Sequence, residues 1–221
     1  MSLDFDTLVE RARSLAAGDR RAVLGITGAP AAGKTTLAEE LVAAVAESSP
    51  PGWVAHVPMD GFHLADVELV RLGLRDRKGA PDTFDALGYA ALLRRLREDQ
   101  DDMIYAPGFE RVIEQPIAGA IPVARHARLI VSEGNYLLLD EHGWGAVRRC
   151  LDEVWYLDVP PEVREQRLLR RRLSFGHEPR AAEDWVREVD GRNGRTVESS
   201  RSRADLVVHL DVPETTDAPL P

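Results

Sequence analysis

Apolar residues along the chain fall into two patterns that alternate from beginning to end. Short, nearly continuous apolar runs bounded by turn residues are typical of buried strands, and apolar residues at helical spacing are typical of amphipathic helices. The first pattern predicts strands at residues 22–27, 53–59, 128–133, 153–158 and 205–212. The second predicts helices at 3–17, 34–47, about 64–72, 85–98, 160–173, about 180–190 and 195–203.

This alternation predicts the fold class. Strands that alternate with helices form an α/β fold, in which helices cover both faces of a parallel sheet and ligands bind at the carboxyl ends of the strands. We expect one domain over residues 1–212. The segment 213–221, PETTDAPLP, is expected to be a disordered tail because it has too little apolar surface to pack.

Composition excludes several classes of function. The chain of 221 residues has a formal net charge of −9, which disfavours nucleic acid and membrane surfaces as partners because both attract extended positive patches. One cysteine, Cys150, excludes an intramolecular disulfide, and there is no secretory signal or long apolar span. We therefore expect a cytoplasmic protein. The oligomeric state stays open, a homodimer included.

The clearest motif follows the first predicted strand. GAPAAGKTT, residues 28–36, matches the phosphate loop G-x-x-x-x-G-K-[ST] and opens a helix, as that motif requires. Backbone N–H groups of such a loop converge on phosphate oxygens at the positive end of the helix. Lys34 is expected to reach the β and γ phosphates and Thr35 to bind Mg²⁺. The predicted ATP-binding residues are Gly28, Ala29, Ala31, Ala32, Gly33, Lys34, Thr35 and Thr36.

The alternative to a phosphate loop is a glycine-rich turn with a surface lysine. Lys34 and Lys78 are the only lysines among 28 basic residues, so a lysine at this position departs from the chain's preference for arginine. A phosphate loop also occurs in GTPases and motors. A GTPase should carry Asn-Lys-x-Asp, which is absent, and DALG at 85–88 and DEHG at 140–143 match only a pattern that arises by chance.

A kinase needs a base for the acceptor hydroxyl, a further Mg²⁺ partner and positive charge over the transferred group. MDGFHL, residues 59–64, follows the second predicted strand and offers Asp60 as the base, although Asp-Gly is also an ordinary turn. Glu133 ends LIVSE and could bind Mg²⁺ through a water, or face solvent. The case for His63 is weaker, because a lone histidine near a helix start is more often a cap or a surface residue than a ligand.

Five arginines crowd the predicted helix at 160–173, namely Arg164, Arg167, Arg170, Arg171 and Arg172. At helical spacing Arg164, Arg167 and Arg171 share a face, which Arg170 borders. Such a run is usually a solvated face paired with acids, here Glu162 and Glu165. On a lid it would instead neutralise the charge on the phosphoryl group.

These motifs together resemble the superfamily of uridine kinases, phosphoribulokinases and bacterial type I pantothenate kinases. The resemblance rests on GAPAAGKTT, MDGFHL, RKGAPDTFD at 77–85, YAPGFER at 105–111, LIVSEGNYLLL at 129–139 and the arginine-rich segment. It covers about residues 20–210. It is nearest to short proteins described as nucleoside or nucleotide kinase-like, some of them labelled fructose-transport-associated kinases.

The resemblance implies a P-loop kinase with a small arginine-rich lid at about residues 164–178, which uses ATP and Mg²⁺ to phosphorylate a hydroxyl of a small molecule. It implies catalytic roles for Asp60, Lys34, Arg170 and Arg171, and a metal site at Thr35 and Glu133. The implied acceptor contacts are Asp60, His63, Asp82, Tyr105, Phe109 and Arg111.

The acceptor itself stays open among nucleosides, pantothenate and sugar-like alcohols. Uridine kinases typically carry Asp-Ser-Phe-Tyr where this chain has Asp60 to His63, and pantothenate kinases are usually longer. The competing function is that of a nucleotide-binding regulatory or assembly ATPase without a small-molecule acceptor.

Overall fold

The computed structural model describes residues 4–98 and 100–209, so the predicted tail and residues 210–212 of the last predicted strand lie outside it. Five strands form a parallel sheet in the order β2-β5-β1-β6-β7. Their bounds are β1 Ala22–Thr27, β2 Val54–His56, β5 Leu129–Glu133, β6 Glu153–Asp158 and β7 Leu206–His209. The predicted parallel α/β sheet is confirmed.

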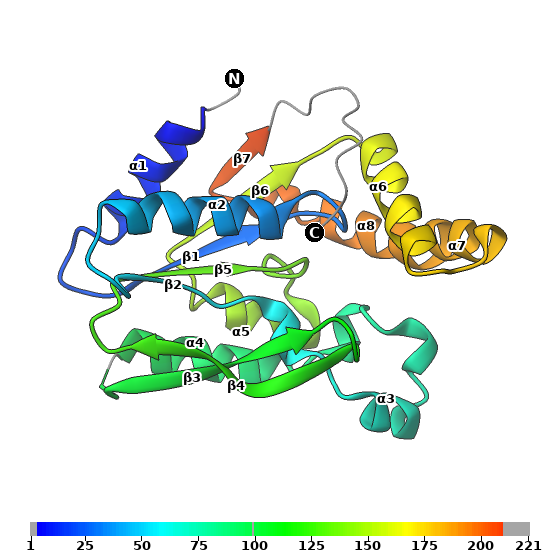
Figure 1. The fold of residues 1–221 in the computed structure, drawn as a ribbon, viewed down its shortest axis with the longest axis horizontal. Coiled ribbons are helices and arrows are strands. Elements are labelled where there is room, and N and C mark those ends of the chain that lie inside the picture. Colours follow the sequence, from blue (N-terminus) through cyan, green and yellow to red (C-terminus); the bar gives the residue numbers. More distant parts are fainter. Residues whose placement is uncertain (1–3, 99, 210–221) are drawn as a thin grey trace.

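Helices cover both faces of this sheet (Figure 1). The larger helices are α1 Phe5–Leu15, α2 Lys34–Glu47, α4 Ala86–Glu98, α6 Pro161–Ser174 and α8 Gly191–Glu198, and the shorter ones are α3 Asp66–Leu72, α5 Trp144–Arg148 and α7 Pro179–Trp185. Side chains of one strand alternate between the two cores, because successive residues point to opposite faces. On β1, Val23 packs in the core with α4 and α5, whereas Leu24 and Ile26 pack in the core with α1 and α2.

A two-stranded antiparallel hairpin lies outside the main sheet and was not predicted. It consists of β3 Met103–Glu110 and β4 Gln115–Ala124, with an irregular register between Ala106 and Gly108. Its buried residues Ile104, Ala106 and Val123 join the core around α4. Helix α5 was also missing from the predicted elements. The hairpin lies on the same side of the main sheet as α3 (Figure 1).

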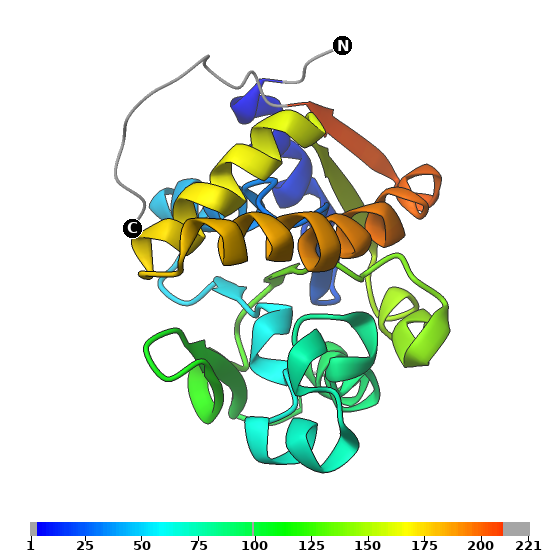
Figure 2. The same cartoon turned by 90° about the vertical axis from the view of Figure 1, so that its right-hand side faces the viewer.

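Two predicted boundaries are corrected. The predicted strand 53–59 ends at His56, and Met59–Phe62 forms a 3₁₀ helix instead. The predicted helices at 180–190 and 195–203 are a nearly continuous arm: α7, a π-helical turn at Val186–Asp190, α8 and a 3₁₀ turn at Arg201–Arg203. Figure 2 shows this arm and α6 crossing above the part of the molecule that holds α3 and the hairpin.

Parallel packing brings several chain segments to one edge of the sheet. The loop at 28–33 follows β1, Glu133 is the last residue of β5, and α6 follows β6 after a short connection. Asp60 follows β2 at the same edge. No helix within the described residues is long and apolar enough to cross a membrane.

Candidate active site at the carboxyl edge of the sheet

The loop between β1 and α2 has the backbone geometry of a phosphate loop. Gly33 precedes α2 with φ 93°, and Ala31 also takes a left-handed conformation, with φ 60°. Gly28 has φ 156°, and a Cβ there would lie 2.7 Å from the carbonyl oxygen of Leu157. Glycine is required at residue 28 because the loop passes this close to β6. Unpaired N–H groups at the start of α2 then form a ready anion site.

Lys34 lies in the first turn of α2 and is only 8% exposed. Its ammonium donates a hydrogen bond to the carbonyl oxygen of Ala29, 3.1 Å away, which folds the side chain back over the loop. Burial lowers the pKa of Lys34, while the charges of Glu133 and Asp60 raise it. A buried lysine held beside two carboxylates is not the surface lysine of the alternative interpretation.

Glu133 is 4% exposed, so the interpretation of it as a solvent-facing acid is wrong. Its Oε1 accepts a hydrogen bond from the hydroxyl of Thr35, 3.0 Å away. Burial, and then the nearby charge of Asp60, raise the pKa of Glu133 to about 7, against the opposing influence of Lys34. The carboxylate therefore lies where negative charge is costly without a further cation.

The oxygen atoms of Thr35 and Glu133 fit Mg²⁺. This ion usually takes one or two protein carboxylates and completes its shell with water and substrate phosphates. Within the described residues, no group of three or more His, Cys, Asp or Glu side chains could hold a metal by itself. Thr35 and Glu133 would therefore hold the ion together with the phosphates of ATP, because the protein does not supply enough ligands by itself.

Asp60 lies in the 3₁₀ helix, where two hydrogen bonds to its carbonyl oxygen fix its backbone. Its carbonyl oxygen accepts hydrogen bonds from the backbone N–H of His63, at 3.2 Å, and from Nδ1 of His63, at 2.9 Å. Gly61 packs against β3, where a Cβ would lie 2.3 Å from the carbonyl oxygen of Pro107. Glycine is therefore needed at residue 61 because the hairpin packs directly on it. The interpretation of Asp-Gly as an ordinary turn does not account for this requirement.

His63 is the C-terminal cap of the 3₁₀ helix, as the cap interpretation expected, and its half-buried ring is not a free surface side chain. Its ring lies 4.0 Å from the ring of Phe84 and 4.8 Å from that of Phe109, measured between centroids. Burial lowers the pKa of His63, although the charge of Asp60 raises it. Because Nδ1 bonds to a carbonyl oxygen, it carries the proton of the neutral ring. Lys78 lies over the Phe109 ring at 5.7 Å and binds Asp66 at 2.7 Å.

The arginines of α6 have different roles. Arg164 is buried, donates to the carbonyl oxygen of Val159 at 3.0 Å and pairs with Glu198. Arg172 pairs with Asp190 at 3.2 Å and lies over the Trp185 ring. Both arginines anchor α6 to the following arm. Within the described part of the chain, neither pairs with Glu162 or Glu165, so the interpretation as a self-paired solvated face is wrong for them.

The arginine that reaches the phosphate loop is Arg167, which was not among the predicted catalytic residues. Its Nη1 donates to the carbonyl oxygen of Ala31, 3.2 Å away. Desolvation lowers the pKa of Arg171, and the positive charge of Arg111 lowers it further. The negative charges of Asp190 and Asp60 act in the opposite direction and raise this pKa. Arg171 thus lies within electrostatic reach of the predicted base. Arg170 and Arg171 are both exposed, and desolvation, followed by the charge of Arg170, lowers the pKa of Arg167.

The predicted acceptor contacts are only partly gathered. His63 and Phe109 touch each other beside Asp60, and the charge of Arg111 lowers the pKa of Glu133. Tyr105 is 61% exposed, and its neighbours Ile104 and Ala106 point into the core. Its side chain therefore lies on the outer face of the hairpin.

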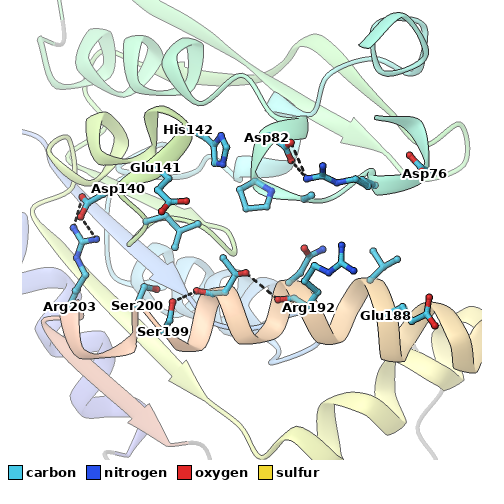
Figure 3. Close-up of a pocket in the computed structure, with 17 residues that line it drawn as sticks. Asp76, Asp82, Asp140, Glu141, His142, Glu188, Arg192, Ser199, Ser200 and Arg203 are labelled. Atoms are coloured by element: carbon cyan, nitrogen blue, oxygen red, sulfur yellow. Dashed lines mark hydrogen bonds and ion pairs between the residues drawn. The ribbon is translucent and has the colours of Figure 1, made fainter. Parts of the chain in front are cut away.

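Asp82 lies apart from this group and faces a separate cavity of about 680 Å³. Its carboxylate pairs with Arg77 at 2.9 Å (Figure 3). The cavity lies between this loop, residues 139–142 and one side of α8, where Arg192 points into it (Figure 3). Lys34, Asp60 and Glu133 do not line it, so it is not the place where phosphoryl transfer would occur.

The chain is similar in sequence to a known protein family and to several proteins of other organisms. The model of the phosphoribulokinase / uridine kinase family matches residues 23–216. The "Putative uridine kinase C227.14" of Schizosaccharomyces pombe is 35% identical over 176 residues, which cover 78% of this chain and 75% of that protein. The "Uncharacterized protein YggC" of Escherichia coli is 32% identical over 193 residues, covering 86% and 78% respectively.

Two solved structures agree with this assignment. The "putative fructose transport system kinase" from Silicibacter sp. TM1040 superposes with a TM-score of 0.84 at 35% identity, covering 93% of this chain and 99% of that one. YFH7 from Saccharomyces cerevisiae, described as "a putative P-loop containing kinase with a circular permutation", gives a TM-score of 0.79 at 19% identity and covers 94% of this chain and 99% of that one, which supports the fold alone. The predicted superfamily and P-loop kinase fold are confirmed, and the chain belongs to the phosphoribulokinase / uridine kinase family.

Proposed function

We propose that this protein is a kinase that uses ATP and Mg²⁺ to phosphorylate a hydroxyl group of a small molecule, either a nucleoside, pantothenate or a sugar-like alcohol. One observation carries the proposal. Asp60, Glu133 and buried Lys34 act on one another electrostatically beside the phosphate loop. Phosphoryl transfer to an alcohol needs this combination of base, metal partner and cation, whereas nucleotide binding alone does not need the base.

Each residue has a distinct role in this proposal. Lys34 and the N–H groups of the loop would hold the phosphates of ATP, and Thr35 and Glu133 would hold Mg²⁺, which would supply charge neutralisation at the phosphates. Asp60 accepts the proton of the acceptor hydroxyl as that oxygen attacks the γ phosphorus. His63 fixes the backbone of the base, since both of its N–H groups bind the carbonyl oxygen of Asp60.

In this proposal, Arg111 and Arg171 supply positive charge over the transferred phosphoryl group. Arg171, on α6, and Arg111, in the hairpin turn, both lie within electrostatic reach of the carboxylates. Arg167 holds the loop at Ala31 from the same helix. The segment 164–178 would act as a lid, with its first turn held by buried Arg164 and its last turn held to the following arm by Arg172.

The test measures ADP release with a panel of pantothenate, nucleosides, hexoses, pentoses and simpler alcohols, and identifies the phosphorylated product by mass spectrometry. We expect turnover that depends on one acceptor class and on Mg²⁺, well above ATP hydrolysis without acceptor. Tight ATP binding without acceptor-dependent turnover across the panel would refute the proposal and favour a nucleotide-binding regulatory or assembly ATPase.

A further inference from the structure

Two buried hydroxyl groups join α4 and β5 to the segment that carries Asp60. The hydroxyl of Tyr89, on α4, bonds to that of Ser132, on β5, and Ser132 also bonds to the carbonyl oxygen of Val57. A carbonyl oxygen can only accept and Ser132 has one proton, so Ser132 donates to Val57 and Tyr89 donates to Ser132. Both side chains are fully buried, and burial raises the pKa of Tyr89, so its hydroxyl keeps the proton that it donates.

These hydrogen bonds end at the point where β2 leaves the sheet. The register of β2 with β5 ends at the pair of His56 and Val131, and the N–H of Val57 then donates to the carbonyl oxygen of Val131, 2.9 Å away. The carbonyl oxygen of Val57 accepts its hydrogen bond from the side chain of Ser132. A side chain of β5 therefore holds the connection that leads from β2 to Asp60.

The ring of Tyr89 contacts the same segment on the other side of Asp60. Its centroid lies 4.8 Å from that of the Phe62 ring. Phe62 follows Asp60 by two residues, and Val57 precedes it by three. Through its ring and its hydroxyl, one side chain of α4 is therefore linked to the backbone on both sides of the proposed base.

The proposed metal residue is tied to the same set of contacts. Glu133 directly follows Ser132 on β5, and Gly134 packs against Met59, the neighbour of Asp60. A Cβ on Gly134 would lie 2.5 Å from the Cβ of Met59, so the two segments touch next to both acids. Because the carboxylates of Asp60 and Glu133 repel each other, they keep a fixed separation only if their backbones are held.

We propose that Tyr89 and Ser132 are positioning residues that set the place of Asp60 relative to Glu133. The proposal rests on the proposed kinase function, in which Asp60 must direct the acceptor hydroxyl at the γ phosphorus. In such an alignment, a misplacement of about 1 Å can lower the rate by a factor on the order of 10². Both hydroxyl groups are buried and bond to protein atoms, so they act through the backbone of the base and not by touching a substrate.

Steady-state kinetics tests this role with single hydroxyl deletions. Ser132→Ala removes both hydrogen bonds, whereas Tyr89→Phe removes only the first and keeps the ring on Phe62. We expect kcat to fall by roughly tenfold in Ser132→Ala and roughly threefold in Tyr89→Phe, while the dissociation constant of ATP stays within about twofold. Ser200→Ala is the matched control and should keep the wild-type kcat, because Ser200 is a buried serine that donates to the carbonyl oxygen of Val197 within the arm.

A double-mutant cycle with Asp60 separates positioning from a general loss of structure. The Asp60→Asn protein has no base to position, so adding Ser132→Ala to it should lower phosphoryl transfer by less than about twofold further. If Ser132→Ala costs as much in this background as in the wild type, the hydroxyl groups act on something other than the base, and the proposal is overturned.

Hydrogen exchange tests the hold on the segment without requiring turnover. The backbone N–H of His63 donates to the carbonyl oxygen of Asp60, and it should exchange roughly tenfold faster in Ser132→Ala than in the wild type, whereas amides in the middle of α2 should not. Wild-type exchange at His63 in the folded variant would overturn the proposal. If Ser132→Ala does not fold, Tyr89→Phe/Ser132→Ala replaces it, because that variant leaves no buried phenol without an acceptor.

The two proposals fail in distinguishable ways. If no acceptor is phosphorylated but exchange at His63 is faster in Ser132→Ala, the kinase function fails, and the hold of Tyr89 and Ser132 on the segment stands. If an acceptor is phosphorylated but Ser132→Ala keeps the wild-type kcat, the positioning role fails and the kinase function stands. Urea unfolding curves of each variant show which of them are folded under the assay conditions.

Discussion

Replacing Glu133 with glutamine should change how the stability of the protein depends on pH. The pKa of Glu133 rises from its ordinary value of 4.5 to about 7, chiefly because the carboxyl is buried. The folded protein then binds this proton more tightly than the unfolded chain does. Folding stability from this group is therefore full below pH 4.5 and is lost as the pH rises through 7. Glutamine resembles the protonated acid and cannot lose the proton.

The size of the effect follows from the pKa change. A difference of this size corresponds to roughly 3 kcal/mol over the whole titration, at 1.36 kcal/mol for each pH unit. Between pH 5 and pH 8 the wild-type free energy of unfolding should fall by roughly 2 to 3 kcal/mol relative to that of Glu133→Gln. The comparison between the two proteins cancels the titration of the other groups.

Urea unfolding at a series of pH values, in the presence of a chelator and without nucleotide, measures this difference. Glu10→Gln is the matched control, because Glu10 is exposed on α1 and makes the same chemical change away from the site. Curves of wild type and Glu133→Gln that run parallel from pH 5 to pH 8 would refute the reasoning. They would mean that the cost of ionising the buried carboxyl is offset by interactions other than the charge of Lys34 and the hydrogen bond from Thr35.

The remaining predictions concern catalysis. Asp60→Asn should retain ATP binding, measured by calorimetry, and reduce phosphoryl transfer by a factor on the order of 10² or more; unchanged turnover would exclude Asp60 as the base. Lys34→Ala should weaken ATP binding or transfer, and a fully active variant would contradict the role of the loop. Arg167→Ala should impair transfer by about tenfold or more, whereas Arg170→Ala should change it less than about threefold, because only Arg167 contacts the loop. Equal effects on kcat/KM would show that the contact with Ala31 is not used.

Much of the fold could be predicted because the signals are local. The strands at 22–27 and 153–158 and the helix at 34–47 have the predicted bounds, since each has a strong apolar pattern ended by turn or capping residues. The hairpin escaped prediction for the opposite reason. Pro107, Pro116 and Pro122 interrupt its strands, and much of β4 is exposed, so neither the composition nor the apolar pattern is that of a buried strand.

Some residues of the candidate site could be predicted from the sequence, and others could not. Lys34, Thr35 and Glu133 could be found because a motif or a strand end fixes their place, and parallel strands must bring those ends to one edge. The choice among the arginines could not be made from sequence. Arg164, Arg167 and Arg171 share one helical face, yet one is a buried anchor, one holds the phosphate loop and one is exposed. Those differences arise from residues far away in the chain, such as Glu198 and Ala31.

The Asp-Gly-Phe-His segment shows why the base depends on tertiary structure more than on its own turn. An Asp-Gly pair after a strand is compatible with many loops, and nothing local determines where its carboxylate points. Here the segment is held from two sides: the hairpin packs directly on Gly61, and the His63 ring, enclosed by Phe84 and Phe109, binds the carbonyl oxygen of Asp60. Phe109 belongs to the hairpin that the sequence did not predict. The element that was hardest to foresee is therefore the one that fixes the position of the proposed base.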